Sequence, residues 1–278
     1  MSIRTPLEPI IVTDLFPDIR LELTRVLESL TDEQWEFPTA CTGWTVRDVA
    51  LHLLGTRVGL LSGMRDHDGQ WFKVDDFQEL VNLINAQNEL WVKAARRISR
   101  KLLISLLSFT NQQVIDYLNT LKPLETGGGI GWTGNSTDPI WMHIARELTE
   151  QWMHHQHICD AADIVSLKEA RFVHPVLGTF IHALPQTFRD TESPIDTLVK
   201  LVITGEGGGT WHLVRETAGW ALYADTDLTP TTTISMDSDT AWRLFTKGLE
   251  AETVRQRTDV EGDRTLFETL LTTVAIIA

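Results

Sequence analysis

Residues 141–157 read WMHIARELTEQWMHHQH, and this stretch decides the fold that we expect the chain to adopt. Its apolar side chains recur every three or four residues, which is the spacing of an amphipathic helix. They are Trp141, Ile144, Ala145, Leu148 and Trp152, with Cys159 two turns further on. The polar side chains form a second stripe, at His143, Glu147, Glu150, His154 and His157. The stretch therefore predicts a bundle helix that runs from Pro139 to about residue 162.

Helical periodicity extends over the first two thirds of the chain. It predicts further helices over residues 14–30, 45–63, 75–100 and 102–121, the last with a break near residues 108–110. The segments that begin at Thr31 and Thr45 look like capping boxes, the first opening one short turn and the second a long helix. Residues 102–121 continue the helical stretch of residues 75–100. Counted in this way, and with the helix after Pro139, the pattern gives four long helices and indicates an up-down bundle.

The pattern changes to alternation after residues 189–194. Strands are predicted over residues 198–204, 210–215, 220–223 and 231–236, and helices over residues 237–249 and 263–277. Residues 170–188 are predicted to form a connecting helix. We therefore predict an α+β protein of two domains. A four-helix bundle occupies residues 1–165, and a connecting helix with a small α+β domain occupies residues 166–278.

The composition limits the kinds of partner that we expect the chain to bind. Lys and Arg number 24 against 38 Asp and Glu, so the 278-residue chain carries a net charge of −14. Such a chain repels phosphate backbones and anionic lipid, which argues against nucleic acid and membrane partners. Two cysteines and a first segment without a targeting signal favour a reduced, cytoplasmic protein. We expect a monomer or a homodimer.

Two interpretations of the Glu/His stripe stay open on the residues alone. Glu150 and His154 lie four residues apart, so both side chains can reach one metal ion, but the same stripe suits a solvated helix face. His52 likewise suits either a ligand or a packing residue. Cys159 falls on the apolar stripe and is predicted to be a core residue, whereas Cys41 lies in a loop before a helix. The glycines of residues 205–209 fit a turn between strands better than a phosphate loop, because no Lys-Ser/Thr follows.

Several motifs together resemble one known family. They are LTDEQW at residues 30–35, PTACTGWTVRDVALH at 38–52, AARRIS at 94–99, EQWMHHQ at 150–156 and AWRLFTKG at 241–248. The chain resembles the mycothiol-dependent maleylpyruvate isomerase family, which belongs to the DinB-like metal-binding four-helix bundles. In that family a second, sterol-carrier-protein-like domain follows the bundle.

The resemblance implies a metal site with His52, Glu150 and His154 as ligands and zinc as the expected ion. Three protein ligands leave one position open, as in catalytic sites. A low-molecular-weight thiol, mycothiol or an equivalent, would bind there as its thiolate. It would add to the cis double bond of a small unsaturated acid, allow rotation, and leave to give the trans isomer. His155 and His157 are additional to this pattern.

The same reaction needs a cation for the substrate carboxylates. The resemblance implicates a basic residue of the second domain, and Arg243 and Lys247 are the candidates, although either also suits a solvated helix end. Three other functions remain possible at this stage. They are a related thiol S-transferase, a non-catalytic binding or regulatory protein for an apolar ligand, and a metal-dependent hydrolase.

Overall fold

A computed structural model describes residues 3–69 and 77–275. The chain divides into two compact units. The first, called the helical unit below, consists of Val12–Lys122 and Glu147–Leu167. The second, the sheet unit, consists of Met1–Ile11, Pro123–Arg146 and Lys168–Ala278. Residues 123–146 thus belong to the same compact unit as the C-terminal part of the chain, whereas a single boundary near residue 165 groups them with the helices before it.

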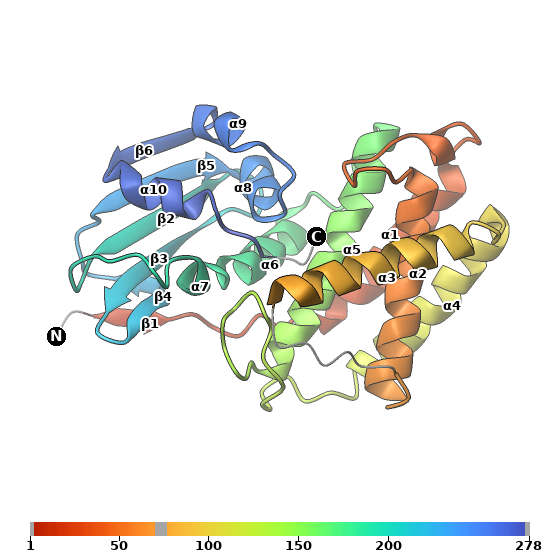
Figure 1. The fold of residues 1–278 in the computed structure, drawn as a ribbon, viewed down its shortest axis with the longest axis horizontal. Helices are drawn as coiled ribbons and strands as arrows, with labels where there is room; N and C mark the ends of the chain where they lie inside the picture. Colours follow the sequence, from red (N-terminus) through yellow and green to blue (C-terminus); the bar gives the residue numbers. More distant parts are fainter. Residues whose placement is uncertain (1–2, 70–76, 276–278) are drawn as a thin grey trace. The chain divides into compact units, whose positions relative to one another are not determined.

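The helical unit is built from the segments in which helical periodicity was predicted (Figure 1). Its elements are η1 (Thr13–Leu15), α1 (Phe16–Ser29), η2 (Gln34–Glu36), α2 (Val46–Leu60), the π-helical turn η3 (Leu61–Arg65), α3 (Phe77–Ala95), α4 (Arg100–Leu118) and the larger part of α5 (Ile140–Ala162). The predicted helix start at residues 75–76 lies outside the described residues. None of the helices in the described part of the chain is long and apolar enough to cross a membrane.

The predicted break near residues 108–110 is wrong, because α4 is continuous through this point. Thr110 is buried, and its hydroxyl donates a hydrogen bond to the carbonyl of Leu106, one turn earlier. The polar side chain is therefore satisfied inside the helix and does not interrupt it.

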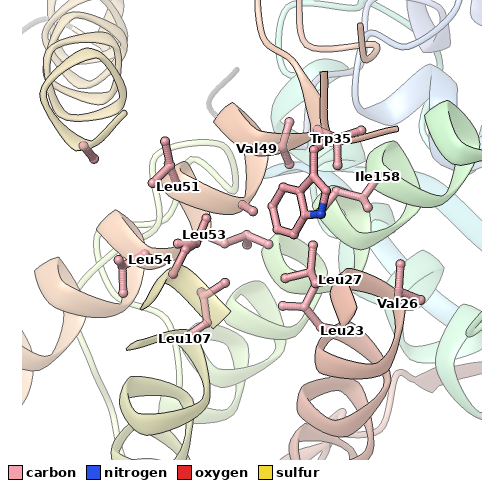
Figure 2. Packing of buried hydrophobic residues seen from close by; sticks show 14 of the residues in the cluster. Leu23, Val26, Leu27, Trp35, Val49, Leu51, Leu53, Leu54, Leu107 and Ile158 are labelled. Atoms are coloured by element: carbon pink, nitrogen blue, oxygen red, sulfur yellow. The ribbon is translucent and has the colours of Figure 1, made fainter. Parts of the chain in front are cut away.

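The core of the helical unit joins α1, α2, α4 and the end of α5 (Figure 2). Trp35 of η2 packs at the centre of the view, among leucines and valines of α1 and α2. Leu103 and Leu107 enter from α4, and Ile158 and Cys159 from α5. Cys159 is completely buried, which confirms its prediction as a core residue. The core thus contains residues of both α2 and α5, the two helices that carry the predicted ligands.

Within the described residues, the sheet unit holds one six-stranded sheet in the order β1-β4-β3-β2-β5-β6. The strands are β1 (Arg4–Pro6), β2 (Leu198–Thr204), β3 (Gly209–Glu216), β4 (Gly219–Thr226), β5 (Thr232–Asp237) and β6 (Thr258–Gly262). The helices are α6 (Ala170–Ile181), α7 (Leu184–Thr187), α8 (Ser238–Phe245), α9 (Ala251–Gln256) and α10 (Arg264–Leu270). An α+β fold is thus confirmed, with β1 and β6 as edge strands that the alternation did not predict.

Pairing in the sheet follows the alternation of the sequence. The central strand β2 pairs antiparallel with β3 and parallel with β5, so that Leu201 lies opposite Trp211 and Ile234. These three side chains are buried, and α8 packs against both β2 and β5. The predicted turn at residues 205–209 joins β2 to β3, and Gly205 and Gly207 have positive φ of 86° and 69°. Glycine suits both positions because it has no Cβ to clash there.

Candidate metal centre

The capping box predicted at Thr45 fixes the start of α2. The Thr45 hydroxyl accepts a hydrogen bond from the Asp48 amide, and the Asp48 carboxylate accepts one from the Thr45 amide. Arg96 binds the same carboxylate through two nitrogens, at 2.8 and 2.9 Å. The pKa of Asp48 is lowered, because these bonds and charges outweigh the effect of burial. These bonds hold the start of α2, the helix that carries His52 two turns after Thr45.

The second helix that carries predicted ligands is α5, and hydrogen bonds hold it close to Glu150 and His154. The indole nitrogen of Trp152 donates to the carbonyl of Leu167 at 2.7 Å, within the buried core. His155 contacts the hydroxyl of Ser166 at 2.8 Å, and that hydroxyl donates to Glu22 of α1. The hydrogen bonds of Trp152 and His155 therefore hold the turn of α5 that contains Glu150 and His154.

Three predicted ligands come together in the helical unit. Oε1 of Glu150 lies 3.0 Å from Nε2 of His52 and 3.3 Å from Nε2 of His154. The rings of the two histidines meet edge to face, with centroids 4.7 Å apart. A tetrahedral ion with nitrogen and oxygen ligands at its usual bond lengths places them about 3.4 Å apart. One carboxylate and two imidazoles at these distances fit a divalent ion such as zinc.

The charges of the three side chains are strongly coupled. Burial lowers the pKa of His52, more than its hydrogen bond to Glu150 raises it. Burial also acts to lower the pKa of His154, but the charge of Glu150 and hydrogen bonds to Glu150 and Cys41 raise it to about 10. The two histidines in turn hold the pKa of Glu150 well below its usual value, despite burial. Without a metal, Glu150 is therefore ionised and His154 carries the compensating proton.

Both histidines are buried, at 5% exposure for His52 and 7% for His154. The interpretation of this part of the polar stripe as a solvated face is therefore wrong. By contrast, His143 is only half-buried and makes a contact of 2.9 Å between its Nε2 and the carbonyl of Gly128 in the sheet unit. The stripe thus divides between the two units.

A short loop before α2 adds two residues that the pattern analysis did not connect with the ligands. The Trp44 amide donates to the Cys41 carbonyl, and Gly43 between them has a φ of +81°, as in a type II turn. This turn places Sγ of Cys41 3.2 Å from Nδ1 of His157 and 3.8 Å from Nδ1 of His154. The Trp44 ring lies 5.0 Å from the His52 ring, and its nitrogen donates to Glu89. A helical period cannot reveal such contacts, because they depend on the loop conformation.

A buried arginine lies five residues after His52 on α2. Arg57 has no exposed surface, and its Nε donates to Oδ1 of Asn111 at 2.8 Å. One of its terminal nitrogens lies 3.8 Å from a carboxylate oxygen of Glu147. Burial lowers the pKa of Arg57, and the charges of Glu147 and Glu150 oppose this shift. Glu147, on the predicted polar stripe, thus serves as counter-charge to a buried cation.

The candidate cations of the second domain lie in the sheet unit. Nε of Arg243 donates to Oδ2 of Asp239 at 2.9 Å, and its guanidinium lies 4.3 Å from the centre of a Trp242 ring. Lys247 follows α8, is exposed, and has a φ of +57°. The structure therefore brings together the three predicted ligands within one unit and places the two predicted cations in the other.

The half-buried carboxylate of Glu150 lies between two imidazoles, and together the three side chains form a group in the helical unit that could hold a metal ion. The family model for the mycothiol maleylpyruvate isomerase N-terminal domain matches residues 16–159, more than half of the chain. The chain belongs to this family, as the motifs of residues 30–52 and 150–156 predicted.

Two solved structures are also similar to the chain. They are the mycothiol-dependent maleylpyruvate isomerase and its H52A mutant, with TM-scores of 0.47 and 0.45. Each is 11% identical, and each alignment covers 84% of this chain and 86% of the other. No curated protein matches the chain.

Proposed function

We propose that this protein is a metal- and thiol-dependent enzyme of the maleylpyruvate isomerase type, or a related thiol S-transferase. The observation that carries the proposal is the convergence of His52, Glu150 and His154 in a chain of this family. We further propose that the helical unit is a DinB-like up-down bundle, and that the sheet unit corresponds to the sterol-carrier-protein-like second domain. The predicted functional division into residues 1–165 and 166–278 belongs to the same proposal.

The three side chains make a ligand set with a single negative charge. His52 is neutral because of burial, and Glu150 is ionised. His154 gives up its proton when its Nε2 becomes a ligand. These three side chains would hold a divalent ion, most simply zinc, which would supply an open position that stabilises a thiol as its thiolate. Burial of the two imidazoles limits the access of water to this side of the site.

The reaction class then requires two small molecules, a thiol and an unsaturated acid. The thiol, mycothiol or an equivalent, adds to the cis double bond, the resulting single bond rotates, and elimination restores the thiol and gives the trans acid. Arg243 and Lys247 are our candidates for holding the acid's carboxylates, as charged hydrogen-bond donors do. Two free cysteines suit the reducing compartment that such a thiol needs, and we keep the prediction of a cytoplasmic location.

The test is metal analysis of the purified protein, followed by assays with a panel of thiols and cis unsaturated acids. We expect turnover that requires both a thiol and a bound metal, and that is lost after chelation and restored by metal. Glu150→Gln keeps the shape of the ligand but removes its charge, so it should lower metal affinity and activity together. Metal-loaded protein without thiol-dependent turnover of any acid in the panel would refute the proposal.

A further inference from the structure

Cys41 lies between two histidines of α5 at distances that suit a metal ion. Its Sγ is 3.2 Å from Nδ1 of His157 and 3.8 Å from Nδ1 of His154. One donor atom from each of the three residues lies within 4.8 Å of the others. At usual bond lengths, a tetrahedral ion places a thiolate sulfur and an imidazole nitrogen about 3.6 Å apart. The two measured distances lie on either side of this value.

This set is distinct from the set of His52 and Glu150, although His154 belongs to both. Nε2 of His154 faces the Glu150 carboxylate, whereas Nδ1 faces Cys41. The two nitrogens point away from opposite sides of one ring, so one ion cannot use all five side chains. Cys41 and His157 therefore do not complete the first ligand set.

We propose that Cys41, His157 and Nδ1 of His154 form a second metal site, which selects thiophilic cations such as Cd²⁺ or Cu⁺. The donor set carries this selectivity, because a thiolate is a soft ligand, whereas the first set has only nitrogen and carboxylate oxygen. The inference goes beyond the proposed function and does not depend on catalysis. Because a neutral imidazole has only one nitrogen with a free lone pair, an ion on Nδ1 of His154 leaves Nε2 protonated and so removes this ligand from the first set.

The surroundings of the two cysteines show why Cys41 and not Cys159 is assigned this role. His154 and His157 are 7% exposed and Cys41 is half-buried, so a cation can reach the sulfur and then be shielded by the rings. Their rings lie edge to face with centroids 5.3 Å apart, which keeps both imidazoles near the sulfur. Cys159 also contacts a histidine, at 3.3 Å from His155, but it is fully buried in the apolar core.

The experiment is a titration of the metal-free full chain with Cd²⁺, followed by the ultraviolet charge-transfer absorption of a cadmium thiolate. In the wild-type chain we expect this absorption to increase until one equivalent of Cd²⁺ has been added. It should be absent in Cys41→Ser and unchanged in the matched control Cys159→Ser. His157→Gln should weaken binding at least about tenfold, because it removes a ligand. Glu150→Gln should retain the absorption, which separates this result from failure of the first site.

A second measurement uses the unmodified chain and so does not depend on the folding of a variant. Cd²⁺ should protect Cys41 from alkylation by iodoacetamide, as measured by mass spectrometry of the Cys41 peptide. Magnesium, a hard ion that avoids thiolates, should give no protection at the same concentration. Absorption that persists in Cys41→Ser, or Cys41 alkylation at the same rate with and without Cd²⁺, would overturn the proposal.

Discussion

Oε1 of Glu150 lies 3.3 Å from Nε2 of His154, one helical turn further along α5, and both side chains sit against His52 of α2. The pair can hold either a proton or a metal ion in the same place. In the metal-free chain the proton occupies it, because burial, which lowers the pKa of His154, is outweighed by the charge of Glu150 and by hydrogen bonds to Glu150 and Cys41, which raise it to about 10. A metal ion must displace this proton before it can bind.

The affinity for metal should therefore increase with pH. At pH 7.5, well below the His154 pKa of about 10, binding of one ion should release about one proton. The apparent association constant should rise about tenfold per pH unit in this range. Calorimetry in buffers with different ionisation enthalpies measures the number of protons released. Binding without proton release at pH 7.5 would contradict the assignment of His154 as a ligand.

The stability of the metal-free chain should depend on pH in the opposite direction. The pKa of His154 in the folded chain, about 10, is above the usual value of 6.5. The protonated pair thus stabilises fully below about pH 6.5, and this contribution is lost as the pH rises toward 10. Urea unfolding of the metal-free chain should accordingly give lower midpoints at pH 9.5 than at pH 6. In His154→Gln the dependence should be weaker, and equal slopes in both proteins would refute the argument.

Removal of one ligand should abolish stoichiometric binding. His154→Ala takes away a side chain common to both candidate sites, and its affinity for zinc should fall by at least about 100-fold, more than outer-shell changes cost. The matched control is His143→Ala, on the same helix and the same predicted stripe but in contact with Gly128. Elemental analysis after desalting should show zinc in the control and in the wild type only. Full zinc content in His154→Ala would rule out this site.

The helices of the helical unit and the common face of Glu150 and His154 could be predicted from the sequence because they depend on local rules. The capping box at Thr45 sets where α2 begins, and the spacing of Glu150 and His154 sets their common face. His52 was predicted to join them only from the family resemblance, because periodicity alone also allowed it to be a packing residue. The solvated interpretation of the stripe was wrong at His154 because a helix pattern does not show what packs against its polar side.

The contact of Cys41 with α5 could not be predicted in this way. It joins residues 113 and 116 positions apart in the chain, through a turn whose shape depends on Gly43. The edge strands β1 and β6 were missed for a similar reason, because they are only three and five residues long. Too few residues alternate in them to establish a period, and their pairing with β4 and β5 is set by tertiary contacts.

Removal of one partner from the buried ion pair of Arg57 should strongly destabilise the helical unit. Arg57→Met preserves much of the volume but leaves Glu147 and the amide of Asn111 without their buried partner. Breaking a buried pair in this way costs about 3–5 kcal/mol. The control Arg65→Met removes a pair with the neighbouring Asp66 at the surface, which should cost less than about 1 kcal/mol. Urea denaturation followed by tryptophan fluorescence measures the free energy of unfolding of both variants. Similar losses in the two would contradict the argument that burial makes the Arg57 pair the more costly one to break.

The proposed reaction requires a cation that holds the substrate carboxylates. The chain has a net charge of −14, so an anionic substrate gains no attraction from the protein as a whole and needs a local positive group. Arg243 is paired with Asp239, its Nε lying 2.9 Å from Oδ2 of that carboxylate, and an arginine side chain carries five N–H donors in all. Lys247 is exposed and lies two residues after the end of α8, the helix that carries Arg243.

We expect Arg243→Ala or Lys247→Ala to retain full zinc and to lose about 10- to 100-fold in kcat/KM. This corresponds to loss of a charged hydrogen bond of about 1.5–3 kcal/mol from the transition state. Arg255→Ala is the control, since Arg255 belongs to the same unit and pairs with Glu268. Steady-state assays with a carboxylate substrate distinguish the three variants. If both Arg243→Ala and Lys247→Ala turn over substrate normally, the carboxylates are held elsewhere, and Arg57 becomes the next cation to test because its charge acts on His52.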